Sequence, residues 1–190
     1  MFESIACGAS RKMASYLNWN EVEEAEFYLG MKVLLHNVRM IAGIALLSLF
    51  MGVFWESCFV FSVFGFLRLK AGGFHCKESW QCFSLTSSIV IGGALAAWGM
   101  ESMSIVQIIG IYVILCVLAC MIAPQGTENR PISCAMQRKR KRETIMCLIV
   151  YMFLAIILKN TAGKFIIVAS MLEMVSLVPS VIMNKFPASA

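Results

Sequence analysis

The sequence has few charged residues and few histidines, and the low charge restricts the kinds of protein to which it can belong. Only 14% of its 190 residues are charged and only 2 are histidines. A soluble domain usually carries about 25% charged residues, so the composition excludes an ordinary soluble protein. Residues 1–30 also lack a positively charged start followed by a short apolar core and a small-residue cleavage site, so we expect no cleavable signal peptide.

Long apolar runs are what the sequence does contain. Hydrophobic residues make up 59% of the chain, and several runs approach or exceed the roughly 18–20 residues that cross a bilayer as a helix. We predict an all-α, polytopic helical membrane protein in which residues 1–190 form a single membrane-embedded domain. The predicted membrane-spanning helices, about six in number, cover residues 38–55, 58–69, 83–99, 104–123, 144–158 and 165–183. Glu56 and Ser57 form the predicted turn between the first two spans.

The first 35 residues differ from the rest because polar residues interrupt the apolar ones. Apolar residues recur at helical spacing between Phe2 and Leu17, which predicts an amphipathic helix lying in the membrane interface. The acidic segment 21–26, EVEEAE, predicts the start of a second short helix with Asn20 as its N-cap. We therefore predict interfacial or cytoplasmic helices over residues 1–35 and a six-helix transmembrane bundle over residues 36–190.

Basic residues are distributed unevenly along the chain. If the N-terminus is cytoplasmic, the cytoplasmic connections hold Arg68, Lys77 and the run 138–142, RKRKR. The external turns then hold only the two lysines of the segment 159–164, KNTAGK. Because cytoplasmic loops of membrane proteins are enriched in Lys and Arg, we predict a multi-pass protein with both termini in the cytoplasm.

Cysteine is plentiful but does not follow a disulfide pattern. The chain has 8 cysteines, several of them inside apolar runs, and no two stand in a CxxC pair. Cys116 and Cys120 share one helical face, which is ordinary packing for a small apolar side chain. We expect mostly free thiols, which the reducing cytoplasm would keep available.

The stretch 68–82, RLKAGGFHCKESWQC, gathers the most reactive side chains at one predicted membrane edge. A cysteine nucleophile acts as a thiolate, and a nearby imidazole can take its proton, so Cys82 and His75 form a candidate catalytic pair. Seven residues of continuous helix would separate their Cα atoms by about 10 Å, too far for a direct hydrogen bond. The stretch must therefore break or bend, and Gly72 and Gly73 permit this.

Three other interpretations of this stretch stay open. His75 could be an ordinary interface residue and Cys82 a packing residue. Cys76 could be the nucleophile instead, although a residue adjacent to His75 points away from it on a regular element. A metal site formed by His75, Cys76 and Cys82 lacks a fourth ligand and the usual spacing.

The order Arg68, Ala71-Gly72-Gly73, His75 and Cys82 resembles the core motif of the AgrB family. The segments 26–38, EFYLGMKVLLHNV, and 123–132, APQGTENRPI, are also similar to segments of that family. AgrB proteins are cysteine endopeptidases of the bacterial cell membrane that process precursor peptides in quorum sensing. The resemblance implies a thioester acyl-enzyme, release of the precursor's C-terminal tail and cyclisation to a thiolactone.

The resemblance also implies roles for individual residues. Cys82 matches the nucleophile and His75 the general base, while Arg68, Gly72 and Gly73 match supporting positions. Arg68 could also simply be a charge that sets topology, and Gly73 a residue that breaks a helix. The motif fixes no third orienting group, for which the open candidates are Glu78, Gln81, Glu128 and Asn129. Cys76 departs from the family pattern, because a small, inert residue is expected there.

The family's substrates are precursor peptides with an amphipathic N-terminal helix and an acidic C-terminal tail. The resemblance therefore implies such a peptide and the lipid bilayer as partners, a homodimer, no cofactor and no nucleic acid. The basic run Arg138, Lys139, Arg140, Lys141 and Arg142 has two compatible interpretations. It could set topology and attract anionic lipid, at about 1 kcal/mol per cation, and it could also bind the acidic tail.

Glu173 lies inside the last predicted span, where an ionisable group is a candidate for function. The alternative is a protonated carboxyl group that makes hydrogen bonds between helices. Six spans and a central glutamate would also suit a small-molecule or peptide transporter. No internal repeat is visible to support transport, and the reactive residues gather at one interface, so a peptidase is favoured.

Overall fold

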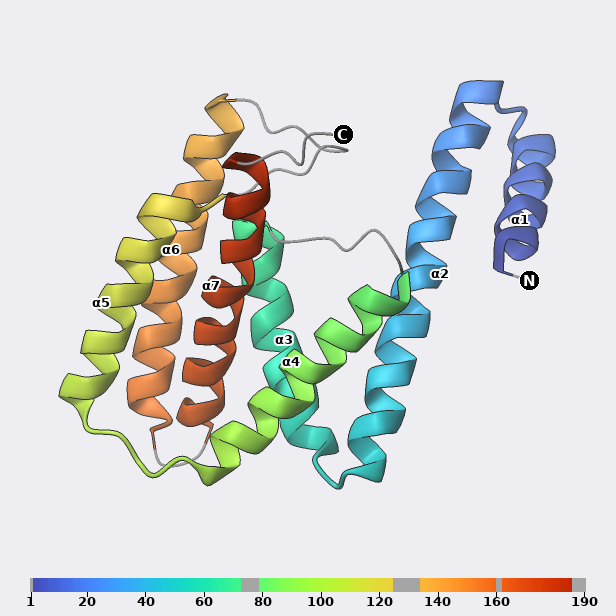
Figure 1. Ribbon diagram of the computed structural model, residues 1–190. Helices are drawn as coiled ribbons and strands as arrows, with labels where there is room; N and C mark the ends of the chain where they lie inside the picture. Colours follow the sequence, from blue (N-terminus) through green and yellow to red (C-terminus); the bar gives the residue numbers. More distant parts are fainter. Residues whose placement is uncertain (1, 73–78, 125–133, 160–161, 186–190) are drawn as a thin grey trace. The chain divides into compact units, whose positions relative to one another are not determined.

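The computed structural model describes residues 2–72, 79–124, 134–159 and 162–185, which form seven α-helices and no β-strand (Figure 1). The all-α class predicted from the apolar runs is confirmed. The helices are α1 (Phe2–Leu17), α2 (Glu21–Phe50), α3 (Phe54–Ala71), α4 (Ser79–Gly99), α5 (Ile105–Ile122), α6 (Cys134–Ile157) and α7 (Gly163–Lys185).

The chain divides into two compact units, residues 1–47 and residues 48–190. In the first unit, Lys32 Nζ lies 2.8 Å from Glu3 Oε1 and joins α2 to α1. The hydrogen bond from Lys32 lowers the pKa of Glu3 below its ordinary value. Asn20 caps α2 as predicted, because its Oδ1 accepts from the Glu23 N–H at 2.9 Å while Glu23 accepts from the Asn20 N–H.

Two predictions about the first apolar run are wrong. The acidic segment 21–26 does not begin a separate short helix, because α2 runs without interruption from Glu21 to Phe50. No proline falls within α2, and Gly30, where an added Cβ would meet nothing within 4 Å, costs only about 1 kcal/mol. The following turn lies at residues 51–53 rather than at Glu56 and Ser57, with Gly52 at φ 69°.

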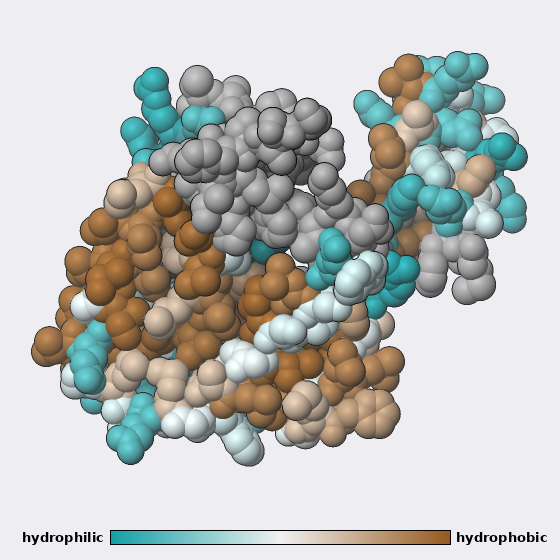
Figure 2. Space-filling view, viewed as in Figure 1, coloured by the Kyte–Doolittle hydropathy of each residue, from teal (hydrophilic) through white to brown (hydrophobic). Residues whose placement is uncertain are grey.

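The buried and exposed faces of α5 are both apolar, which indicates that the second unit is surrounded by hydrocarbon rather than water. Ile108, Tyr112, Leu115 and Ala119 recur at helical spacing and are buried. On the outer face, Val106 is 80% exposed and Met121 is 77% exposed. Figure 2 shows apolar side chains, in brown, over α5 and its neighbours. Such a surface is unfavourable in water and suits the hydrocarbon of a bilayer.

Three helices are long and apolar enough to cross a membrane: α2, residues 80–99 of α4, and α5. The protein is therefore an all-α membrane protein. The helices α3, α6 and α7 coincide with the other predicted spans, but within the described residues they do not meet the same criteria. The six-span arrangement stays a prediction.

Helix α7 lies at the centre of the second unit and packs against α3, α4, α5 and α6 (Figure 1). Residues 166–170 of α7 are all buried, as are Glu173, Met174 and Leu177. The helix α4 comes close to α7 at Gly93, where an added Cβ would lie 2.6 Å from the Leu172 side chain. Small residues allow such close helix approach in membranes.

The helix α6 begins at Cys134, ten residues before the predicted start of its span at 144. The basic run 138–142, which the apolar pattern assigned to the connection before this span, is therefore part of α6. Arg and Lys are good helix formers, so the helix extends beyond the apolar segment. The consequence is that the five cations lie at fixed helical positions at one end of α6.

Candidate functional site

The stretch that holds the candidate catalytic pair is not one continuous helix. The helix α3 ends at Ala71 and α4 begins at Ser79, which confirms the predicted break. Gly72 ends α3 with φ 83° and ψ −157°, and its N–H donates to the Arg68 carbonyl at 2.9 Å. That backbone region is essentially restricted to glycine. Gly72 therefore has a conformational reason to be glycine.

Cys82 lies in the first turn of α4 and is half-buried. His75, Gly73, Cys76 and Glu78 lie outside the described residues, as do Glu128 and Asn129. The pairing of His75 with Cys82 therefore stays a prediction. Gln81 is exposed in the same turn as Cys82.

The clearest electrostatic feature of the second unit is an ion pair between α3 and α7. Arg68 Nη1 lies 4.0 Å from Glu173 Oε2. The Arg68 side chain is 24% exposed, whereas that of Glu173 is fully buried. Long helical side chains point back toward their own N-terminus, and the Arg68 guanidinium lies 5.6 Å from the Phe64 ring centre, one turn earlier. Such stacking adds a cation–π attraction.

Of the two Glu173 carboxyl oxygens, only Oε2 has a polar partner among the described residues. Ser176 Oγ donates to Glu173 Oε2 at 3.1 Å. Glu173 Oε1 is buried and has no hydrogen-bond partner among the described residues. Lys164, near the start of the same helix, donates to the Trp98 carbonyl at 3.3 Å. Burying an ionised carboxylate is costly unless it is paired, and the Arg68 guanidinium is the positively charged group that lies 4.0 Å from Oε2.

From the sequence, Arg68 and Glu173 were each considered singly, and their pairing was not predicted. A signal was present, because Arg68 lies at the end of one predicted span and Glu173 lies inside another, and opposite charges in a membrane protein tend to pair. Their sequence positions did not indicate that α3 and α7 are neighbours. The close packing of α3 against α7 supplies that information.

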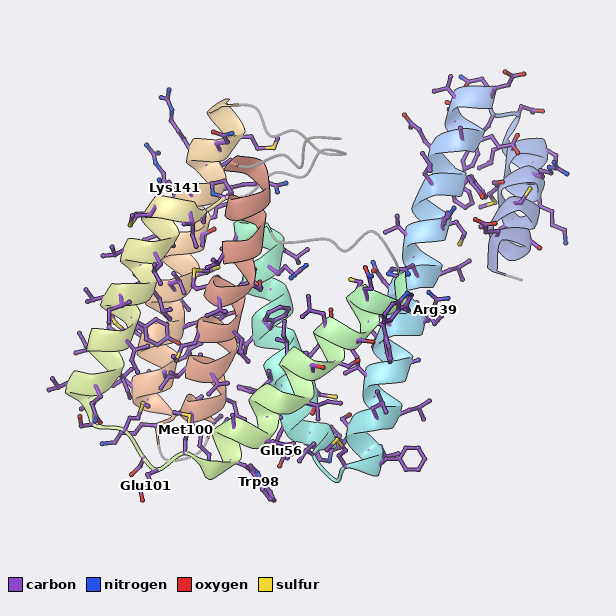
Figure 3. The ribbon with its side chains drawn as sticks, in the orientation of Figure 1. Arg39, Glu56, Trp98, Met100, Glu101 and Lys141 are labelled. Carbon is purple, nitrogen blue, oxygen red and sulfur yellow. The ribbon has the colours of Figure 1, made fainter. Side chains whose placement is uncertain are left out.

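A second ion pair ties the end of α3 to α6. Lys70 Nζ lies 3.0 Å from Glu143 Oε2, and the hydrogen bond lowers the pKa of Glu143 below its ordinary value. Glu143 directly follows the basic run 138–142 on α6. Figure 3 shows Lys141 at this end of the bundle and Trp98, Met100 and Glu101 at the opposite end. The end of α3, its Arg68 and the basic run therefore belong to the same end of the second unit.

Among the described residues, no three His, Cys, Asp or Glu side chains are grouped closely enough to hold a metal ion. Six cysteines whose side chains the structure describes are free: Cys7, Cys58, Cys82, Cys116, Cys120 and Cys147. Cys82 is the one among them that directly follows the helix break.

A family model described as AgrB, accessory gene regulator B, matches residues 9–177. The chain belongs to the AgrB family. A putative AgrB-like protein of Clostridium acetobutylicum is 26% identical over 182 residues, which cover 94% of this chain and 86% of the relative. Accessory gene regulator protein B of Staphylococcus aureus is 21% identical, covering 88% and 91% of the two chains.

A third relative, protein FsrB of Enterococcus faecalis, is 26% identical over 139 residues, 72% of this chain and 57% of the relative. No solved structure matches the chain. The region matched by the AgrB model contains Cys82, Arg68 and Glu173. The AgrB membership predicted from the stretch 68–82 is confirmed, and with it an accessory gene regulator role.

Proposed function

We propose that this AgrB protein is an integral-membrane cysteine endopeptidase of quorum sensing. It would remove the C-terminal tail of a precursor peptide and promote cyclisation of the remainder to a thiolactone. The observation that supports this most directly is the position of Cys82. It is a free, half-buried thiol in the first turn of α4, immediately after the break between α3 and α4.

In the proposed reaction, His75 takes the proton of the Cys82 thiol. The Cys82 sulfur attacks the scissile carbonyl carbon, and the carbon–nitrogen bond breaks as His75 returns the proton to the leaving amine. The products are a thioester on Cys82 and a free C-terminal tail. A cysteine thiol within the bound peptide then attacks this thioester, the new ring closes, and its proton passes back to restore Cys82.

The second step requires that water be kept away from the acyl-enzyme. One thioester replaces another in the exchange, which is close to isoenergetic, whereas hydrolysis would be strongly downhill. The site must therefore exclude water and hold the internal thiol near the acyl carbon. The half-buried position of Cys82 in a membrane protein is compatible with both requirements.

The proposed substrate has features that suit surfaces of this chain. An acidic tail would be attracted to the basic run 138–142, of which Arg138, Lys139 and Arg142 are exposed. An amphipathic leader would lie in the same membrane interface as α1, on which Met13, Tyr16 and Leu17 are exposed. We further propose that the protein is a homodimer of the cell membrane with both termini and the site in the cytoplasm.

The test is processing of a precursor peptide by the purified protein in lipid vesicles, followed by mass spectrometry. We expect tail release and an acyl adduct on Cys82. Cys82→Ala should abolish both, while Cys76→Ala and Cys147→Ala should retain them. Normal processing by Cys82→Ala would contradict the proposal. Vesicle uptake of the intact peptide with no cleavage would instead favour a transporter.

A further inference from the structure

The pair of Arg68 and Glu173 has no assigned part in the reaction proposed above. It joins α3, which ends at the helix break, to the central helix α7. Glu173 is fully buried and one of its carboxyl oxygens has no hydrogen-bond partner among the described residues. A pair that served stability alone could be replaced by apolar residues, often without loss. An incompletely satisfied pair in a membrane helix therefore points to function.

We propose that Glu173 is a positioning residue that fixes the Arg68 guanidinium for the acyl-transfer reaction. The inference rests on the proposed function, because it assigns Glu173 to the chemistry of Cys82. Glu173 touches neither reacting atom in this proposal and acts only through Arg68. The negative charge that needs stabilisation is that of the Cys82 thiolate and of the oxygen formed when it attacks the carbonyl.

Two contacts give Arg68 a defined position. Glu173 Oε2 lies 4.0 Å from its Nη1, and the Phe64 ring lies 5.6 Å from its guanidinium carbon. Arg68 lies one helical turn before Gly72. Its backbone carbonyl accepts the hydrogen bond from the Gly72 N–H at the end of α3. The guanidinium is thus anchored one turn before the end of α3. A fixed charge stabilises a transition state better than a mobile one, because no reorganisation is needed during the reaction.

Ser176 supports the carboxylate in turn. Its hydroxyl donates to the same Oε2 that faces Arg68, at 3.1 Å, and also to the Glu173 carbonyl at 2.9 Å. The arrangement is therefore a chain of contacts from Ser176 through Glu173 to Arg68. Removing the serine hydroxyl should loosen Glu173 without removing its charge, which gives a milder variant for the test.

The experiment measures kcat and KM for a precursor peptide that carries an internal cysteine and an acidic tail, with the full-length protein in vesicles. Glu173→Gln keeps the shape of the side chain and removes its charge. We expect kcat to fall between about 10- and 100-fold, the scale of a misplaced catalytic group, with KM changed by less than about twofold. Arg68→Gln should be at least as slow. The double variant should be no slower than Arg68→Gln, because Glu173 acts only through Arg68.

A matched control separates positioning from stability. Tyr112→Phe removes another buried hydrogen bond to α7, from Tyr112 to Ser170 at 3.2 Å. We expect Tyr112→Phe to lower the melting temperature and leave kcat unchanged. Ser176→Ala should lower kcat less than Glu173→Gln does. If Glu173→Gln does not fold, Ser176→Ala is the variant that tests the inference.

The inference is overturned if Glu173→Gln, or Ser176→Ala in its place, processes the peptide as fast as the wild type. It is also overturned if the losses from Arg68→Gln and Glu173→Gln multiply in the double variant, or if Tyr112→Phe slows turnover equally. Wild type and Cys82→Ala are assayed beside these variants. Processing that survives Cys82→Ala contradicts the proposed function itself, whereas Cys82-dependent processing with a normal Glu173→Gln contradicts only the role of Glu173.

Discussion

At the scale of single residues, Gly72 shows how backbone geometry constrains the site. Its φ of 83° and ψ of −157° place it in a region that residues with a Cβ avoid. Its N–H closes the last turn of α3 on Arg68. Gly72 thus ends α3 one turn after Arg68. The glycine pair suspected from the sequence to break the helix does so at Gly72; Gly73 lies outside the described residues.

We predict that Gly72→Ala destabilises the protein by about 1–3 kcal/mol, the cost of a strained backbone position. Gly65→Ala is the matched control, because Gly65 lies within α3 and an added Cβ would meet nothing within 4 Å. That substitution should be neutral or stabilise by about 0.5–1 kcal/mol. Thermal unfolding in detergent measures both, and equal melting temperatures for the two variants would contradict the strain at Gly72.

At the scale of elements, α6 combines two segments that differ in solvent preference. Its first part carries the basic run 138–142, and its later part carries buried Leu148 and Ala155 of the core. Because the run is helical, its cations project from α6 at fixed positions. The ion pair between Lys70 and Glu143 joins α6 to the end of α3. A peptide tail bound by the run would therefore be held near the end of α3.

We predict that replacing all five cations of the run by glutamine raises KM for an acidic-tailed precursor about tenfold or more and changes kcat less. Each exposed ion pair contributes up to about 1 kcal/mol, and 1.4 kcal/mol corresponds to tenfold in affinity. Glutamine favours helix about as well as Lys and Arg, so α6 should persist. Replacing Lys159 and Lys164 in the same way should leave KM unchanged, and an unchanged KM in the fivefold variant would exclude capture by the run.

At the scale of the whole molecule, the exposed apolar faces and the separation of charge describe a membrane protein. In residues 48–190, the basic run and the Lys70–Glu143 pair lie at one end, and the turn containing Glu101 lies at the other (Figure 3). Positive charge gathers on the cytoplasmic side of membrane proteins. The end that carries Arg68 should therefore be cytoplasmic.

We predict that a membrane-impermeant maleimide labels Ser102→Cys in intact cells and labels Met136→Cys only after permeabilisation. Each cysteine is introduced singly into a chain whose native cysteines are replaced by alanine. Ser102 lies between α4 and α5, and Met136 lies in the first turn of α6. Labelling of both sites in intact cells, or the reverse pattern, would contradict the proposed orientation.

Local patterns predicted much of this fold because helices depend on neighbouring residues. Apolar length located part of each helix from α2 to α7, amphipathic spacing located α1, and Asn20 identified the start of α2. The boundaries were less accurate where the criterion was apolarity alone. Apolarity does not mark the start of α6, because Arg and Lys continue a helix without being apolar. The criterion of apolarity also placed the turn before α3 at Glu56 and Ser57, whereas the turn contains Gly52.

The sequence by itself determined the class of the molecule, the AgrB family and the candidate nucleophile Cys82. These follow from composition, from run length and from a motif contained within fifteen consecutive residues, about the length of a few helical turns. Only the tertiary structure decided that α7 is the central helix and that its Glu173 pairs with Arg68. The physical reason is that an ion pair requires two charges a few ångströms apart, and helix packing, not the sequence separation of two residues, sets that distance.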